Sequence, residues 1–153
     1  MRRKDREISG DSALAITDKC NYAVMATVNS DGTPYCIPLS PVRDGEWLYF
    51  HSAKEGHKIE NLRAMNRVCI SCVGDVKAIP GKFSIEFESS VINGTASEVT
   101  EREEKIRALA IISRRYTPDN MPAFNEAIQK DLDRTAVWKI HIDEISGKAR
   151  KPD

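Results

Sequence analysis

Short strand-like segments, separated by glycine-containing turns, dominate the first half of the sequence. Tyr22–Val28, Tyr35–Val42 and Glu46–Phe50 are rich in apolar and aromatic residues, which favour β-strands. Asp31-Gly32 lies between the first two segments and Asp44-Gly45 precedes the third. Because an Asp-Gly pair between such segments favours a hairpin turn, we predict three consecutive strands joined into a meander.

Three prolines, Pro34, Pro38 and Pro41, accompany the second of these segments. Proline has no N–H group to donate, so a strand that contains it lies at a sheet edge or borders an interrupted ladder. In either place neighbouring N–H groups stay free, and we expect those of Leu39 and Ser40 to be available to a ligand.

The second half of the chain adds further strands. Arg67–Val73 has the composition of a strand and is followed by a predicted loop over Asp75–Gly81. Phe83–Val99 changes the phase of its apolar alternation near its middle, which predicts two strands or one strand with a bulge. Thr135–Ile145 alternates regularly and predicts the last strand, and we interpret residues 146–150 as a basic tail.

Apolar residues at helical spacing predict four helices. The first would begin at a cap formed by Asp11 or Ser12, and the third at the capping box Thr100–Glu103. The predicted helices are Asp11–Lys19, Gly56–Met65, a segment that follows the capping box and ends before Pro118, and Met121–Leu132.

The length of the chain and the order of its predicted strands and helices indicate one domain that contains both. A chain of 153 residues can bury a core of its own, and we expect residues 1–153 to form a single domain. Tandem strands with helices inserted between them predict a mainly β, α+β fold, built as a small barrel of six or seven strands with helical insertions.

The charges exclude several classes of partner. Lys and Arg number 23, as do Asp and Glu, so the formal net charge is zero. This balance argues against nucleic acid or an anionic membrane as a partner.

No apolar segment follows the basic start Met1–Lys4, and no stretch is long enough to cross a bilayer, so we expect a cytoplasmic protein without a signal peptide.

The motif Cys69-Ile70-Ser71-Cys72 has the spacing of zinc and redox sites. It lies in a predicted strand, however, where residues three apart point to opposite faces. No second motif of this kind and no paired histidines complete a zinc site. We therefore expect buried apolar thiols and no metal site.

A polar turn follows the aromatic strand and precedes the helix that starts near Gly56. The first N–H groups of a helix have no partner within it, and its dipole attracts anions. Gly56 lets the backbone approach a ligand closely, and Ser52, Lys54, His57 and Lys58 supply donors and positive charge. We infer a phosphate seat at this helix N-terminus.

Two alternatives for this turn need no ligand. The turn can be a solvated strand–helix connection, or Ser52 and Glu55 can form a capping box. The glycine motifs of Rossmann and P-loop nucleotide sites do not occur in the sequence. His141 falls on the polar face of the last strand, so we predict that it faces solvent.

Several motifs in these segments match those of a known family. The most specific group follows the aromatic strand and comprises His51-Ser52-Ala53, Gly56-His57-Lys58 and Asn61-Leu62. The others are Ala26-Thr27-Val28, Asp31-Gly32-x-Pro34-Tyr35-x-x-Pro38-Leu39-Ser40, Arg67-Val68-Cys69, Glu88-Ser89-Ser90-Val91-Ile92-x-Gly94-Thr95-Ala96 and Gly147-Lys148-Ala149-Arg150. The chain thereby resembles the pyridoxamine 5′-phosphate oxidase-like, flavin-binding split barrels, within them the nitroimidazole-resistance branch.

This resemblance implies a six-stranded split barrel, a homodimer, and FMN bound in a cleft at the dimer interface. Ser52, His57 and Lys58 would hold the FMN phosphate, which agrees with the seat inferred from the residues. The phosphate seat favours FMN over FAD or a deazaflavin. The cofactor-binding residues that it implies are Pro38, Leu39, Ser40, His51, Ser52, Ala53, Gly56, His57, Lys58, Asn61, Ser89, Ser90 and Trp138.

Two parts of this set have particular roles in the resemblance. Pro38, Leu39 and Ser40 would border the isoalloxazine ring, with backbone N–H groups near it. The partner subunit's Ser89, Ser90 and Trp138 would complete the pocket.

The activity implied is that of an FMN-dependent oxidoreductase. It would pass hydride from reduced flavin N5 to a small, electron-poor acceptor such as a nitro-aromatic compound, with His51 as the catalytic residue. NADH, NADPH or neither remains open as the direct electron donor. Two other functions also stay open: a non-catalytic flavin carrier or sensor, and a haem-binding split barrel with His51, His57 or His141 as axial ligand.

Overall fold

Residues 2–150 are described by the computed structural model, so Met1 and residues 151–153 of the predicted domain lie outside them. Residues 2–150 contain one antiparallel sheet with the strand order β3-β2-β6-β7-β8-β5-β4, and β1 pairs with β8. The strands are β1 (Glu7–Ile8), β2 (Ala23–Val28), β3 (Pro34–Leu39), β4 (Val42–Asp44), β5 (Trp47–Ala53), β6 (Arg67–Ala78), β7 (Ile85–Glu98) and β8 (Thr135–Arg150). The mainly β prediction is confirmed, with eight strands in place of six.

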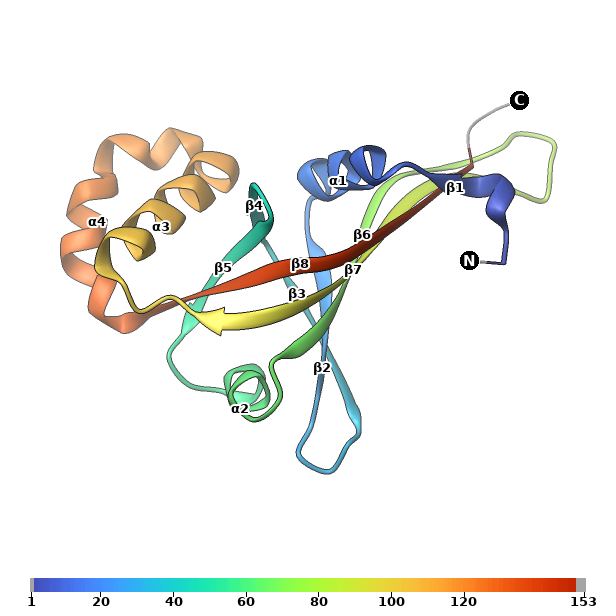
Figure 1. The fold of residues 1–153 in the computed structure, drawn as a ribbon. Helices are drawn as coiled ribbons and strands as arrows, with labels where there is room; N and C mark the ends of the chain where they lie inside the picture. Colours follow the sequence, from blue (N-terminus) through green and yellow to red (C-terminus); the bar gives the residue numbers. More distant parts are fainter. Residues whose placement is uncertain (1, 151–153) are drawn as a thin grey trace.

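Four α-helices accompany this sheet in the described chain (Figure 1). α3 and α4 lie side by side at one end of the molecule, and the β6–β7 hairpin extends from the other end. The helices are α1 (Gly10–Lys19), α2 (His57–Ala64), α3 (Arg102–Tyr116) and α4 (Phe124–Asp131), with 3₁₀ turns at Lys4–Arg6, Pro118–Ala123 and Leu132–Arg134. No helix within residues 2–150 is long and apolar enough to cross a membrane.

The predicted meander is wrong, because β3 and β4 lie at opposite ends of the sheet order. The chain leaves the sheet after Leu39 and turns at Pro41, which is fully buried. Tyr116 of α3 donates a hydrogen bond of 2.7 Å to the Pro41 carbonyl and holds this turn. β5 consequently pairs with β8, from Trp47 opposite His141 to Ala53 opposite Thr135.

Two segments predicted as irregular belong to long strands. The predicted loop at Asp75–Gly81 is wrong in its first half, because β6 continues to Ala78 opposite Ile85. The predicted basic tail is wrong as well, because β8 continues to Arg150 opposite Phe87. β7 is one continuous strand, and irregular pairing accommodates the change of phase between Val73 and Val76 and between Asn93 and Gly94. The N–H and C=O groups of these segments form hydrogen bonds with neighbouring strands. Local sequence does not reveal which strands those are.

The helices confirm their predicted positions more closely than their predicted caps. Ser9, rather than Asp11 or Ser12, caps α1, accepting a hydrogen bond of 3.2 Å from the Ser12 N–H. α3 begins after Glu101 without a side-chain cap, so the predicted capping box is wrong. α4 starts later than predicted because a 3₁₀ turn containing Pro122 precedes it, and proline cannot donate within a helix.

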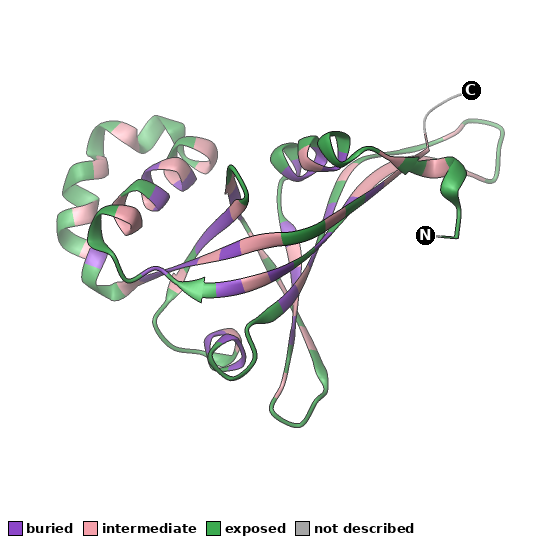
Figure 2. Cartoon of the chain, in the orientation of Figure 1, coloured by how far each residue is buried: buried purple, intermediate pink, exposed green. Residues whose placement is uncertain are grey.

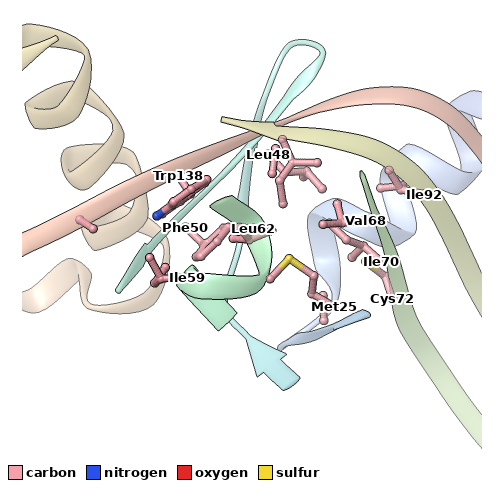
Figure 3. Packing of buried hydrophobic residues seen from close by; sticks show 14 of the residues in the cluster. Met25, Leu48, Phe50, Ile59, Leu62, Val68, Ile70, Cys72, Ile92 and Trp138 are labelled. Carbon is pink, nitrogen blue, oxygen red and sulfur yellow. The ribbon is translucent and has the colours of Figure 1, made fainter. Parts of the chain in front are cut away.

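Two apolar clusters hold the layers together (Figure 2). The larger one fills the inside of the curved sheet, where Phe50, Leu48 and Met25 meet Ile59 and Leu62 of α2 (Figure 3). The smaller one joins β4 and β5 to α3, and its buried members are Val42, Tyr49, Val99, Ala108, Ile112 and Val137. β5 therefore contributes alternate residues to two different cores, as the two-residue period of a strand requires.

Candidate functional site

The start of α2 has free donors. Gly56 occupies the N-cap position with φ of 124°, a conformation that suits glycine, and no side chain caps the helix. The first bonds to the Gly56 carbonyl come from the N–H groups of Ile59 and Glu60. Within the described chain, the N–H groups of His57 and Lys58 have no acceptor. Two unpaired amides and open space beside Gly56 fit a bound anion.

The capping-box alternative for this turn is wrong. Ser52 lies in β5, and its hydroxyl donates a hydrogen bond of 2.8 Å to the Ala53 carbonyl rather than to the helix. The junction of β5 and α2 nevertheless holds four of the predicted residues within a short segment: Ser52, Ala53, Gly56 and Lys58.

Lys58 is an unpaired, half-buried cation at this junction. Its ammonium makes no hydrogen bond or ion pair with any of residues 2–150, and its side chain is half-buried. Its charge acts on His51, whose pKa lies below its ordinary value of 6.5 because of partial burial first and of Lys58 second. An anion bound here would therefore meet an uncompensated positive charge.

His57 and Asn61 have structural partners that the sequence did not reveal. The His57 ring stacks on Tyr35 with 4.0 Å between ring centroids, and its Nε2 lies 2.8 Å from Asn29 Oδ1. Asn61 is buried and donates hydrogen bonds of 3.0 Å to Thr27 Oγ1 and 2.8 Å to Asn29 Oδ1. These side chains hold α2 against the β2–β3 hairpin. Single polar residues such as Asn29 and Asn61 are common in a sequence, so their positions alone do not predict this network.

The edge strand β3 offers fewer free amides than predicted. The Asn29 N–H donates to the Thr33 carbonyl, and the antiparallel register then places Tyr35, Ile37 and Leu39 in hydrogen-bonded pairs with β2. The expectation of a free Leu39 N–H is therefore wrong. Pro38 faces the free edge of β3, where its missing N–H leaves no gap in the ladder. Ser40 lies beyond the ladder and is exposed.

His51 and Ser52 face opposite sides of β5, because successive side chains of a strand alternate. His51 points away from the main core and lines a hollow of about 150 Å³ between β5, α3 and α4. The structure thus brings His51 close enough to Lys58 for electrostatic coupling but separates its ring from the Ser52 hydroxyl. A larger hollow of about 330 Å³, lined by Val91, Asn93, Glu144, Ile145 and Ser146, contains none of the predicted site residues.

The remaining predicted residues lie elsewhere in the chain. Ser89 and Ser90 are on β7, opposite Val73 and Cys72 of β6, and Ser90 is fully buried with its Oγ 2.9 Å from Thr17 Oγ1. The structure thus places the Ser90 side chain in the interior, bonded to α1.

Trp138 lies in the main core, with 3% of its surface exposed. It is directly opposite Phe50 of β5, the residue before His51 (Figure 3). Its Nε1–H is buried without a hydrogen-bond partner among the described residues. An unpaired buried donor is uncommon and costly, and this one lies one strand from the β5–α2 junction.

The two remaining predictions on cysteine and histidine concern side chains outside this junction. Cys69 and Cys72 lie on β6, the first half-buried and the second fully buried, as residues on opposite faces of a strand. His141 is half-buried, and its Nδ1 lies 2.8 Å from Asp143 Oδ1.

Replacing Lys58 with Gln should raise the pKa of His51, because it removes the positive charge that disfavours the imidazolium ion. The folded protein binds this proton less readily than the unfolded chain, so protonation of His51 should reduce stability as the pH falls below about 6.5. An NMR titration of the His51 ring measures the shift, with Lys54→Gln as the control. Equal His51 pKa values in wild type and Lys58→Gln would contradict the assigned contact.

Comparison with known proteins agrees with this architecture. The family model described as pyridoxamine 5′-phosphate oxidase matches residues 10–149, whereas no curated protein matches the chain. A protein named for 5-nitroimidazole antibiotic resistance, from Bacteroides thetaiotaomicron, is 29% identical with a TM-score of 0.78, covering 94% of this chain and 86% of that chain. A protein from Listeria innocua named for pyridoxamine 5′-phosphate oxidase is 26% identical with a TM-score of 0.60, over 88% of this chain and 94% of that chain.

More distant structures share the fold. The FAD and haem binding protein from Mycobacterium smegmatis is 21% identical with a TM-score of 0.78, covering 96% of this chain and 74% of that chain. Taken with the match over residues 10–149 and the nitroimidazole-resistance relative, these findings show that the chain belongs to the pyridoxamine 5′-phosphate oxidase-like split-barrel family.

Proposed function

We propose that this protein binds FMN with its phosphate at the start of α2 and uses it as an oxidoreductase. The observation that carries the proposal is the pair of unpaired N–H groups on His57 and Lys58, next to the unpaired Lys58 ammonium. A structural neighbour named as an FAD-binding protein supports a flavin as the cofactor.

Each residue at the junction has a distinct task in this proposal. The two amides and the Lys58 ammonium hold the phosphate, and Gly56 leaves space for it. Ser52 can exchange its local hydrogen bond to Ala53 for one to the phosphate. His57 and Asn61 act indirectly, because they hold α2 in place through Asn29 and Thr27. When bound, FMN supplies the hydride transfer.

His51 handles a proton in the proposed reaction. With its lowered pKa, the imidazole is neutral at pH 7 and can donate from one ring nitrogen while accepting at the other. Its ring makes no hydrogen bond within residues 2–150, so both nitrogens are available to an acceptor molecule. The proposed acceptor is a small, electron-poor compound such as a nitro-aromatic, and NADH or NADPH is the proposed reductant.

A second copy of the chain completes the proposed site as a homodimer. On the face of the sheet opposite the main core, Val73 is exposed by 53% and Val91 by 39%, and Tyr22, which precedes β2, is exposed by 60%. Tyr22 and Val73 line one shallow hollow on this face with Val24. Such an exposed apolar face on an antiparallel sheet favours association.

Light scattering in solution should report a dimer, and Val73→Asp should shift the protein towards the monomer, because it places a charge in this interface. A monomeric wild type would contradict the interface.

Lys58→Ala should weaken FMN binding by about ten- to a hundredfold, because it removes one charged contact to the phosphate. Titration of the flavin-free protein, followed by quenching of flavin fluorescence, measures this affinity. Lys77→Ala, an exposed lysine on β6, removes the same charge far from the junction and should bind FMN as wild type does. Unchanged affinity in Lys58→Ala would overturn the phosphate assignment.

Turnover tests the enzymatic part of the proposal. FMN-loaded protein should oxidise NADH or NADPH in the presence of nitrobenzene, and His51→Gln should lower the rate by about a hundredfold with little change in FMN affinity. Flavin that binds but is neither reduced by the nicotinamides nor reoxidised by nitrobenzene would indicate a carrier or sensor. A Soret band in place of flavin absorption would indicate a haem protein.

A further inference from the structure

A hollow between the sheet and the helical pair has walls suited to a small apolar molecule. Its volume is about 150 Å³. The apolar lining comes from both helices and the following turn: Leu109, Phe124, Ala127, Ile128 and Leu132. The polar lining consists of His51, Ser113, Asp131 and Thr135.

The apolar side of α4 is incompletely covered. Phe124 and Ile128 are only half-buried, Ala127 is exposed, and no residue of α4 is fully buried. α4 thus turns an apolar surface towards α3 without filling the space between them.

Two polar groups of this hollow, the His51 ring and the Ser113 hydroxyl, have no hydrogen-bond partner within residues 2–150. The Asp131 carboxylate is paired with Arg134, and the Thr135 hydroxyl donates to the Asp131 carbonyl. His51 makes no hydrogen bond with any of residues 2–150. A ligand in the hollow would therefore meet apolar walls, the unpaired His51 imidazole and the Ser113 hydroxyl.

We infer that this hollow is a binding site for a small, uncharged aromatic ring that lies against the His51 imidazole. The hollow's volume of about 150 Å³ matches a benzene-sized molecule, and the exposed His51 and Ala127 leave the hollow open for such a ring to enter. Apolar walls disfavour a charged ring, because they cannot replace its hydration. The inference rests on the proposed function in one respect: the ring belongs to the electron acceptor, and the hollow is its specificity pocket.

Fluorobenzene is a suitable probe because it fits the hollow and cannot be reduced by the flavin. Fluorine NMR measures its affinity for the protein as purified, and cross-relaxation to the His51 ring protons locates it. We expect contact with His51 in the wild type. No binding, or binding without contact to His51, would overturn the site, and this measurement depends on no variant.

Ala127→Leu should weaken fluorobenzene binding by about tenfold or more, because the larger side chain fills the hollow from its exposed rim. Gln129→Leu adds the same side chain on α4 at an exposed position outside the lining, and it should bind the probe within about twofold of wild type. Equal weakening in both variants, or in neither, would contradict the inference.

The two proposals fail differently. If the protein binds fluorobenzene at His51 but does not oxidise NADH or NADPH with nitrobenzene, the proposed function fails while the ring site stands. If nitrobenzene turns over and Ala127→Leu leaves its KM unchanged, the ring site is wrong and the oxidoreductase function stands. With both correct, Ala127→Leu raises the KM for nitrobenzene without altering FMN affinity.

Discussion

The pairing of β5 with β8 is the interaction on which the arrangement of the site depends. β8 is hydrogen-bonded to β7 along most of its length and to β5 from Thr135 to His141. This second ladder brings β5, whose end leads into α2, next to the helical pair that precedes β8. Without it, Lys58 and the α3–α4 hollow would belong to separate parts of the molecule. The ladder joins residues more than eighty positions apart, so it forms at a high cost in loop-closure entropy.

The alternating direction of the side chains along β5 places the proposed phosphate seat and the proposed acceptor pocket on opposite faces of the strand. Phe50 faces the main core, Tyr49 and His51 face the helical pair, and Ser52 returns to the first side. The proposed phosphate seat and the proposed acceptor pocket are therefore neighbours through one strand without sharing a cavity. This division lets the strand position His51 beside the acceptor while the junction that follows it binds the cofactor.

α2 is held by polar contacts as well as by its apolar face. Ile59 and Leu62 are buried in the main core, and Asn61 and His57 join the helix to Asn29 of the β2–β3 turn. Buried hydrogen bonds of this kind specify one orientation, because a shift of the helix would leave the Asn61 amide unsatisfied in the interior. The free amides at the start of α2 consequently have a defined direction, which is the requirement for binding an anion selectively. Two residues that motif matching assigned to the cofactor thus prove to be engaged with the protein itself.

Local pattern in the sequence determined the strand and helix segments, the glycine at the start of α2, and the family, since each depends on residues close together in the chain. The predicted meander, the caps of α1 and α3, and the free Leu39 amide were wrong, because a backbone group's partner depends on which segments meet. Tyr116, Asn29 and Thr27 are distant partners that no spacing rule identifies. Tertiary structure alone decided that β5 pairs with β8 and not with β3, that α3 and α4 lie beside His51, and that Ser90 is bonded inside the core. The reason is that burial and hydrogen bonding are satisfied over the whole chain, whereas sequence patterns report only the preferences of neighbouring residues.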